Sequence, residues 1–154
     1  MANSTELLRS MRCIFKWLEV CELDVCQTYQ LSLTEVDVLA FLDNNPGLDT
    51  ATDIVELRMI PKANVSQAVD TLIHKALLSK QQDTRDRRRI HLALTPAAQP
   101  IVQALRQARH QFVSRLFGGF TDEDQEAFFD FSRRIVGNAS GALEERRQRH
   151  GSQQ

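Results

Sequence analysis

The stretch Asp83-Thr84-Arg85-Asp86-Arg87-Arg88-Arg89-Ile90-His91-Leu92-Ala93-Leu94-Thr95 decides the fold. Its second half alternates, because Ile90, Leu92 and Leu94 would share one face of an extended chain, and this pattern predicts a β-strand. Residues 78–82 precede the charged run and are predicted to pair with that strand. The sequence therefore predicts a β-hairpin with a strongly basic tip.

Three short helices are predicted before the hairpin. Ser32 with Glu35 has the spacing of a capping box and begins a helix that ends near residue 44. Thr50 with Asp53 begins a short second helix, and Pro61 suits the first turn of a third, which runs to about residue 77. Two short helices joined by a tight turn have the spacing of a helix-turn-helix.

Long helices are predicted on both sides of this lobe. The helix over about 5–28 is apolar around much of its circumference, and two further helices occupy about 96–145, with a break at Gly118-Gly119. We expect one domain over 1–154, with a winged lobe at about 32–95 and dimerisation helices at about 5–28 and 96–145. After about residue 146 the chain is polar, and we expect it to fray.

The outer helices carry more apolar side chains than a lobe of about 60 residues could cover. This surplus predicts a homodimer, although an internal core without a partner is the alternative. The predicted interface residues are Leu7, Leu8, Met11, Phe117, Phe120, Phe128, Phe131 and Ile135.

The net charge of −1 hides a strong asymmetry along the chain. Residues 17–57 contain nine acids and no Lys or Arg, whereas residues 58–91 contain eight bases and three acids. Because phosphate contacts need local positive charge, this segment is compatible with a polyanionic partner. A merely solvated face is the alternative.

Other classes of protein find little support in the sequence. No apolar stretch of about 18 residues and no signal-peptide pattern occurs, so we expect a cytoplasmic protein without membrane contact. Three cysteines and four scattered histidines predict reduced thiols, no metal and no cofactor. The motifs of nucleotide-binding loops, nucleophile elbows and zinc proteases are missing, which argues against an enzyme.

This order of elements, together with two of its segments, resembles the MarR family. Residues 59–78 look like the family's recognition helix, and residues 83–95 look like its wing and the strand that follows; the similarity extends in outline over about 6–140. The fold class implied is mainly α with a β-hairpin wing, a winged helix-turn-helix framed by N- and C-terminal dimerisation helices. The resemblance implies a bacterial or archaeal homodimeric regulator that binds double-stranded DNA at a pseudo-palindromic operator, as a repressor released by a small ligand.

The DNA-binding residues follow from the resemblance and from groove chemistry. An α-helix fits the major groove, and hairpin arginines suit a narrow minor groove. Asp83 and Asp86 are expected to orient the arginines and close the turn. The expected recognition-helix residues are Lys62, Ala63, Asn64, Ser66 and Gln67, and the expected wing residues are Arg85, Arg87 and Arg88.

The sequence departs from the family pattern at several positions. Gln67 stands where arginine is frequent, and Ala76 stands where glycine usually ends the recognition helix. Asp53 and Glu56 would bring negative charge towards the DNA. A protein-interaction module that has lost DNA binding is therefore a second hypothesis.

Regulation leaves two further hypotheses. Similar proteins bind small aromatic or phenolic compounds in a cleft beside the dimer helices, and ordinary core packing is the alternative for each candidate. Cys13 lies where the hydroperoxide-sensing branch of the family has its reactive thiol, but no source of a lowered thiol pKa is evident. The candidate cleft residues are Trp17, Tyr29, Phe41, His110 and Phe112.

Overall fold

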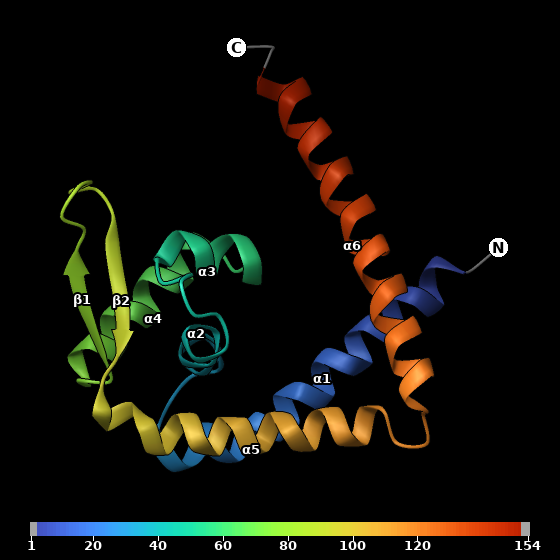
Figure 1. Cartoon of the computed structure of the whole chain (residues 1–154), viewed down its shortest axis with the longest axis horizontal. Coiled ribbons are helices and arrows are strands. Elements are labelled where there is room, and N and C mark those ends of the chain that lie inside the picture. The colour runs from blue at the N-terminus through green and yellow to red at the C-terminus, as the bar shows by residue number, and fades with distance from the viewer. Residues whose placement is uncertain (1–2, 152–154) are drawn as a thin grey trace. The chain divides into compact units, whose positions relative to one another are not determined.

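The computed structural model describes residues 3–151, which form six α-helices, one 3₁₀ turn and one β-hairpin (Figure 1). The domain was predicted over residues 1–154, and its two ends, residues 1–2 and 152–154, lie outside the described residues. The elements in chain order are α1 (Ser4–Tyr29), α2 (Leu33–Asn44), α3 (Ala51–Arg58), α4 (Lys62–His74), β1 (Leu78–Gln82), β2 (Ile90–Leu94), η1 (Pro96–Ala98), α5 (Gln99–Leu116) and α6 (Asp122–Gly151).

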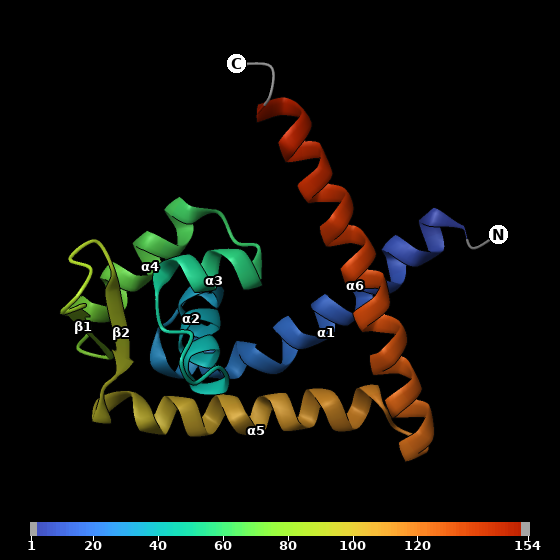
Figure 2. The same cartoon turned by 45° about the horizontal axis from the view of Figure 1, so that its top comes forward.

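The chain divides into two compact units between Ser114 and Arg115. In the first unit, α2, α3 and α4 pack together, and the hairpin β1–β2 lies beside α4 (Figure 2). The strands are antiparallel, with a register that runs from Leu78 opposite Leu94 to Gln82 opposite Ile90. This arrangement confirms the predicted winged helix-turn-helix.

A continuous apolar core holds the first unit together. It combines the end of α1 with α2, α4, the hairpin and the first half of α5. Deep burial of large aliphatic and aromatic side chains supplies most of the driving force for folding. The largest fully buried side chains are Phe41, Leu39, Ile54, Leu72, Leu105, Val36, Val38, Val65 and Val102.

Local hydrogen bonds fix the ends of the short helices. The Ser32 hydroxyl accepts a 3.1 Å bond from the Glu35 amide, and Thr50 with Asp53 forms a complete capping box. Helix α4 ends at His74, and Ala76, two residues beyond it, has a left-handed φ of 58°. Because a glycine adopts this conformation without strain, the structure explains why glycine is usual at this position.

The second unit consists of the end of α5 and the long helix α6. Thr121 and Asp124 cap α6, and Phe117 packs edge-on against Phe120 and Phe128 at centroid distances of 5.8 and 5.3 Å. The predicted fraying after residue 146 is wrong as far as residue 151, because α6 continues there. Residues 143–149 are Leu, Glu, Arg and Gln, which all have high helix propensity, and this favours continuation of the helix.

Within the described part of the chain, no helix combines the length and the apolar composition that a membrane crossing requires.

Candidate nucleic-acid interface

Helix α4 presents one polar face to solvent and buries the other. Val65, Ala68, Val69 and Leu72 lie in the core, so the side chains between them must point outward. These outward side chains are short or carry an amide, which suits close approach to base edges. All five predicted recognition residues lie on the exposed face: Lys62, Ala63, Asn64, Ser66 and Gln67.

The beginning of α4 is open to an anion. Pro61 occupies the N-cap and provides no side-chain hydrogen bond, and the first turn contains no acidic residue. The unpaired amides and the helix dipole therefore remain positive there, next to Lys62. This end of α4 can contact a phosphate while the exposed face enters a groove.

The wing turn is organised by two carboxylates that bind backbone amides. The Oδ1 atom of Asp83 accepts bonds from the amides of Arg85 (2.6 Å) and Asp86 (2.8 Å). Asp86 accepts a 3.0 Å bond from the Arg88 amide. The predicted role in closing the turn matches these bonds, whereas the bonds described for these carboxylates go to amides and a histidine instead of guanidinium groups.

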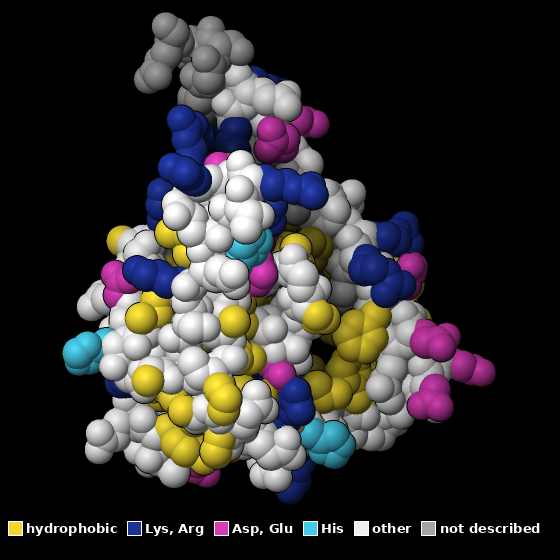
Figure 3. Space-filling model, turned by 60° about the vertical axis from the view of Figure 1, so that its left-hand side comes forward, with side chains coloured by type: hydrophobic (Ala, Val, Ile, Leu, Met, Phe, Trp, Pro, Cys, Tyr) yellow, Lys and Arg dark blue, Asp and Glu magenta, His cyan; other side chains and the backbone are white. Residues whose placement is uncertain are grey.

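The wing arginines extend from this fixed backbone. Arg85 and Arg87 are exposed, and the Gln82 side chain donates a 2.6 Å bond to the Arg87 carbonyl. Viewed from the side of the hairpin, the surface shows basic side chains with acidic ones between them (Figure 3). A rigid turn lowers the entropy lost when exposed arginines become ordered on a partner.

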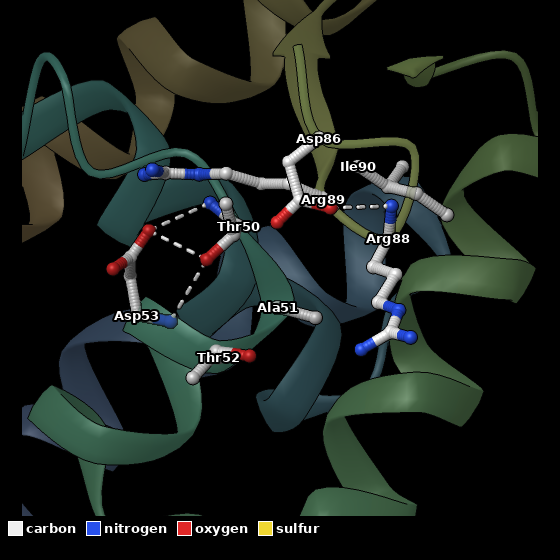
Figure 4. A pocket seen from close by; sticks show the side chains of 8 residues that line it. All are labelled: Thr50, Ala51, Thr52, Asp53, Asp86, Arg88, Arg89 and Ile90. Carbon is white, nitrogen blue, oxygen red and sulfur yellow. Dashed lines mark hydrogen bonds between the residues drawn. The ribbon is translucent and has the colours of Figure 1, made fainter. Parts of the chain in front are cut away.

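Arg88 takes a different position from the other two arginines. With Arg89 it borders an open hollow of about 450 Å³ between the wing and the start of α3 (Figure 4). Asp53 lies across from Arg88, on the side towards which the Arg89 side chain extends (Figure 4), and its carboxylate accepts bonds from the amide (2.9 Å) and hydroxyl (2.6 Å) of Thr50. These bonds lower the pKa of Asp53, so its carboxylate stays ionised while it caps the start of α3.

The structure adds a residue that sequence analysis did not select, His91. Its Nδ1 lies 2.7 Å from an Asp49 oxygen, and its Nε2 lies 3.0 Å from an Asp83 oxygen. The Asp83 bond, followed by the Asp49 bond, raises the pKa of His91. The alternating strand pattern places His91 on the polar face near Asp83, but nothing in the sequence indicates Asp49.

Asp83 is held ionised by the same contacts. The amide of Asp86 and then the ring of His91 lower the pKa of Asp83 to about 2. Each ring nitrogen of His91 faces a carboxylate oxygen, and a carboxylate can only accept a hydrogen bond. Both nitrogens must therefore carry a proton for both hydrogen bonds to form, so His91 is an imidazolium in this arrangement.

Most acids of the segment 17–57 are counter-ions of the first unit's own bases. The Arg109 Nε atom donates a 2.9 Å bond to Glu22, and its Nη2 lies 3.4 Å from Asp37. The Arg106 Nε atom donates a 2.8 Å bond to Asp43. Part of the acidic run is therefore neutralised by bases of helix α5. The acids of α3, Asp53 and Glu56, are not among these ion pairs.

A partly buried charged cluster brings together residues of α1, α2, α3 and α5, namely Glu22, Asp37, Arg58 and Arg109. Glu22 is only 3% exposed, and burial raises its pKa while Arg109 opposes that effect. Arg58 is half-buried and lies 5.7 Å from the centroid of the Phe41 ring. Its Nε atom and the indole Nε1 of Trp17 are buried without a hydrogen-bond partner.

The predicted cleft residues differ in burial. Phe41 belongs to the core, Trp17 and Phe112 are half-buried, and His110 is exposed. Tyr29 borders a separate open hollow of about 310 Å³ between α1 and α5. A common cleft for all five thus stays a prediction.

The predicted interface residues are largely exposed. The exception is Phe117, which is 9% exposed because its own aromatic neighbours cover it. Phe15 and Val136, which the sequence did not single out, are also exposed, at 67% and 62%. The exposed predicted residues are Leu7, Leu8 and Met11 in the first unit, and Phe120, Phe128, Phe131 and Ile135 in the second.

The three thiols are free, and only Cys13 is exposed. Burial raises the pKa of Cys21 and of Cys26, with a smaller contribution from Glu22 in both cases. These two thiols are therefore poor nucleophiles. Among residues 3–151, no three side chains of the types that ligate metals come together in a metal-binding group.

A helix-turn-helix whose last helix exposes a polar face, next to a hairpin with a basic tip, defines a winged helix-turn-helix protein of the kind that binds duplex DNA. Residues 29–89 match the model of the MarR family. The uncharacterized HTH-type transcriptional regulator YwaE of Bacillus subtilis (strain 168) is 31% identical over 117 residues, which are 76% of this chain and 68% of YwaE. The chain belongs to the MarR family of transcriptional regulators.

Solved structures share the fold at lower identity. BpsR of Bordetella bronchiseptica, whose DNA binding is regulated by 6-hydroxynicotinic acid, has a TM-score of 0.67 and 21% identity, with 85% of this chain and 98% of that chain covered. MepR of S. aureus, solved in complex with DNA, has a TM-score of 0.73 and 16% identity, with 89% and 96% covered.

Proposed function

We propose that this regulator binds a specific double-stranded operator as a homodimer and represses transcription until a small ligand releases it. The exposed face of α4 carries the proposal, because Asn64, Ser66 and Gln67 project from a helix that the core holds rigidly. Such side chains can bind base edges in the major groove. The fold is also that of MepR, which was solved bound to DNA.

The proposed wing contact rests on the charge and order of the hairpin tip. Arg85 and Arg87 extend into solvent from a turn closed by Asp83 and Asp86. Arginine is favoured in a narrow minor groove because the negative potential is enhanced there. Recognition by α4 and anchoring by the wing together account for the basic segment 58–91.

The proposed homodimer covers apolar side chains that each unit leaves exposed. A two-fold axis would place two α4 helices in successive major grooves, about 34–36 Å apart, and so require a pseudo-palindromic operator. Leu8→Glu and Phe131→Glu should each shift the protein towards monomer in sedimentation. Leu57→Glu, at an exposed leucine of α3, is the matched control.

The proposed ligand is a small aromatic compound with an acidic or other acceptor group. The unpaired Nε of Arg58 and Nε1 of Trp17 are donors that a buried acceptor could satisfy. The regulation of BpsR by 6-hydroxynicotinic acid provides an example of this ligand chemistry on the same fold. Arg58→Lys should weaken the response to such a ligand and leave DNA binding without ligand intact.

The deciding experiment is fluorescence anisotropy with the DNA upstream of the protein's own gene and with scrambled DNA of equal length, at two salt concentrations. Selective binding that weakens steeply with salt is expected. Equal affinity for both DNAs would contradict sequence-specific recognition. No binding at low salt would favour the hypothesis of a protein-interaction module.

A further inference from the structure

Besides its share of the apolar core, the wing is linked to the rest of the lobe by two contacts between strand β2 and Asp49. The amide of Leu92 donates a 2.7 Å bond to the Asp49 carbonyl, and the ring of His91 binds the Asp49 carboxylate. Asp49 lies in the loop immediately before α3, 42 residues away from His91 in the chain. These contacts are therefore tertiary and determine where the wing lies relative to α3.

The same imidazole also binds the wing turn. Its other nitrogen lies 3.0 Å from Asp83, the residue whose second oxygen holds the amides of Arg85 and Asp86. A chain of polar contacts thus runs from the α3 side, through one ring, to the backbone of the arginine-bearing turn. This series of contacts helps to set the position of the backbone that carries the wing arginines.

We propose that His91 is a positioning residue for DNA binding, which holds the wing through Asp49 and Asp83 and does so fully only when its ring carries both protons. This inference rests on the proposed function, because the consequence is measured as DNA affinity. It concerns a residue that need not touch DNA at all.

The protonation requirement follows from the chemistry of the ring. Each nitrogen faces a carboxylate oxygen, which can only accept, so each nitrogen must donate. A neutral ring has one N–H and must place a lone pair against the other carboxylate. One of the two links is then lost, while the Leu92 amide bond remains, and the wing becomes less well held without detaching.

The pH dependence has a definite sign. The folded protein raises the pKa of His91. Both hydrogen bonds of the ring are therefore present below the ordinary histidine pKa of about 6.5, and one of them is lost as the pH rises through the raised pKa. DNA affinity should therefore fall with increasing pH in the neutral to alkaline range.

The surrounding charges do not compensate for a neutral ring. Across the strand pair, β1 contributes the uncharged Gln81. From α3 the nearest acid is Asp53, whose carboxylate is bound to Thr50 and lies near Arg89. Among the described residues, the charged groups that act on the His91 ring are therefore the two carboxylates of Asp49 and Asp83.

The test compares DNA affinity at about pH 6 and about pH 9 in matched variants. In the natural protein we expect affinity to be about 3- to 10-fold weaker at the higher pH, the size expected for one partly exposed charged hydrogen bond. Asp49→Asn should abolish this difference, because the amide N–H can donate to the unprotonated nitrogen. His91→Gln should bind weakly at both pH values.

His74→Gln is the control for general effects of histidine charge. His74 is exposed in the last turn of α4, beyond the proposed base-contacting residues, and its substitution should leave the pH ratio unchanged. An unchanged ratio in both Asp49→Asn and His91→Gln would overturn the proposal while leaving DNA binding established.

A readout without DNA separates failure of this inference from failure of the proposed function. NMR titration of the His91 ring in the free protein should be compared with the hydrogen-exchange protection factors of the wing amides, which are corrected for the intrinsic pH dependence of exchange. Protection should fall once the ring is deprotonated, and in Asp49→Asn that fall should disappear. If no DNA is bound at either pH, these data still decide the role of His91, and protection factors of the wing that do not change with pH would refute it.

Discussion

The recognition helix and the wing are positioned by different forces. Helix α4 is fixed by buried apolar residues such as Val65 and Leu72, which are fully covered. The strands of the hairpin share that core through Leu78 and Leu92, but the wing turn is held by polar contacts of exposed or half-exposed residues, chiefly Asp83 and His91. Apolar burial is insensitive to pH and salt over the physiological range, whereas exposed polar contacts respond to both. The two DNA-contacting elements should therefore respond differently to the same perturbations.

The largest effect should come from the packing beneath α4. Leu72→Ala removes a fully buried side chain and should lower the free energy of unfolding by about 2–5 kcal/mol, as measured by urea denaturation. The exposed Leu57→Ala in α3 is the control and should change little. Similar losses in both variants would mean that α4 is not held mainly by the core.

A smaller effect, confined to particular base pairs, should come from the exposed face of α4. Gln67→Ala should cost about 1–3 kcal/mol of discrimination at the base pair that it contacts, because an amide can pair bidentately with adenine. Binding to a panel of operator variants measures this, with the exposed Gln103→Ala of α5 as control. Equal weakening on every sequence would remove Gln67 from the specificity determinants.

The wing should give the opposite pattern. Arg87→Ala should weaken binding by about 1 kcal/mol on all sequences and reduce the slope of log affinity against log salt by about one. Arg133→Ala removes an equal charge from the exposed surface of α6 and serves as the control. A normal salt slope in Arg87→Ala would show that this side chain does not contact the DNA backbone or groove.

The smallest effect concerns the end of α4. Ala76→Gly should stabilise the protein by about 0.5–1 kcal/mol, because the left-handed φ of 58° strains alanine and glycine adopts it freely. Ala104→Gly, in the regular part of α5, should instead destabilise by a comparable amount. A loss of thermal stability in Ala76→Gly would contradict the strain argument.

Local sequence signals predicted the elements that depend on neighbouring residues. The capping pair Thr50 and Asp53 forms the expected bonds, and the alternation in residues 90–94 is a strand. Such features were accessible because hydrogen bonds and periodicity act over three or four residues. The residues expected on the exposed face of α4 came from the family resemblance and from groove chemistry.

Other features could not be predicted because they depend on distant partners. The sequence showed nine acids without a base in residues 17–57, but not their partners: Glu22 binds Arg109 across 87 residues, and Asp43 binds Arg106 across 63. Phe117 was expected at an interface and is covered by aromatic neighbours from α6 and the preceding turn. A charge or an aromatic ring in a sequence does not reveal which partner the fold will provide.

The sequence by itself determined the order of helices and the basic hairpin, since these follow from local periodicity, caps and turn chemistry, and its family resemblance added the recognition residues of α4. The tertiary structure alone decided that His91 links Asp49 to Asp83 and that Glu22 and Asp43 are paired with bases of α5. The physical reason is that ion pairs and buried contacts depend on distances in space, which packing of the whole core sets.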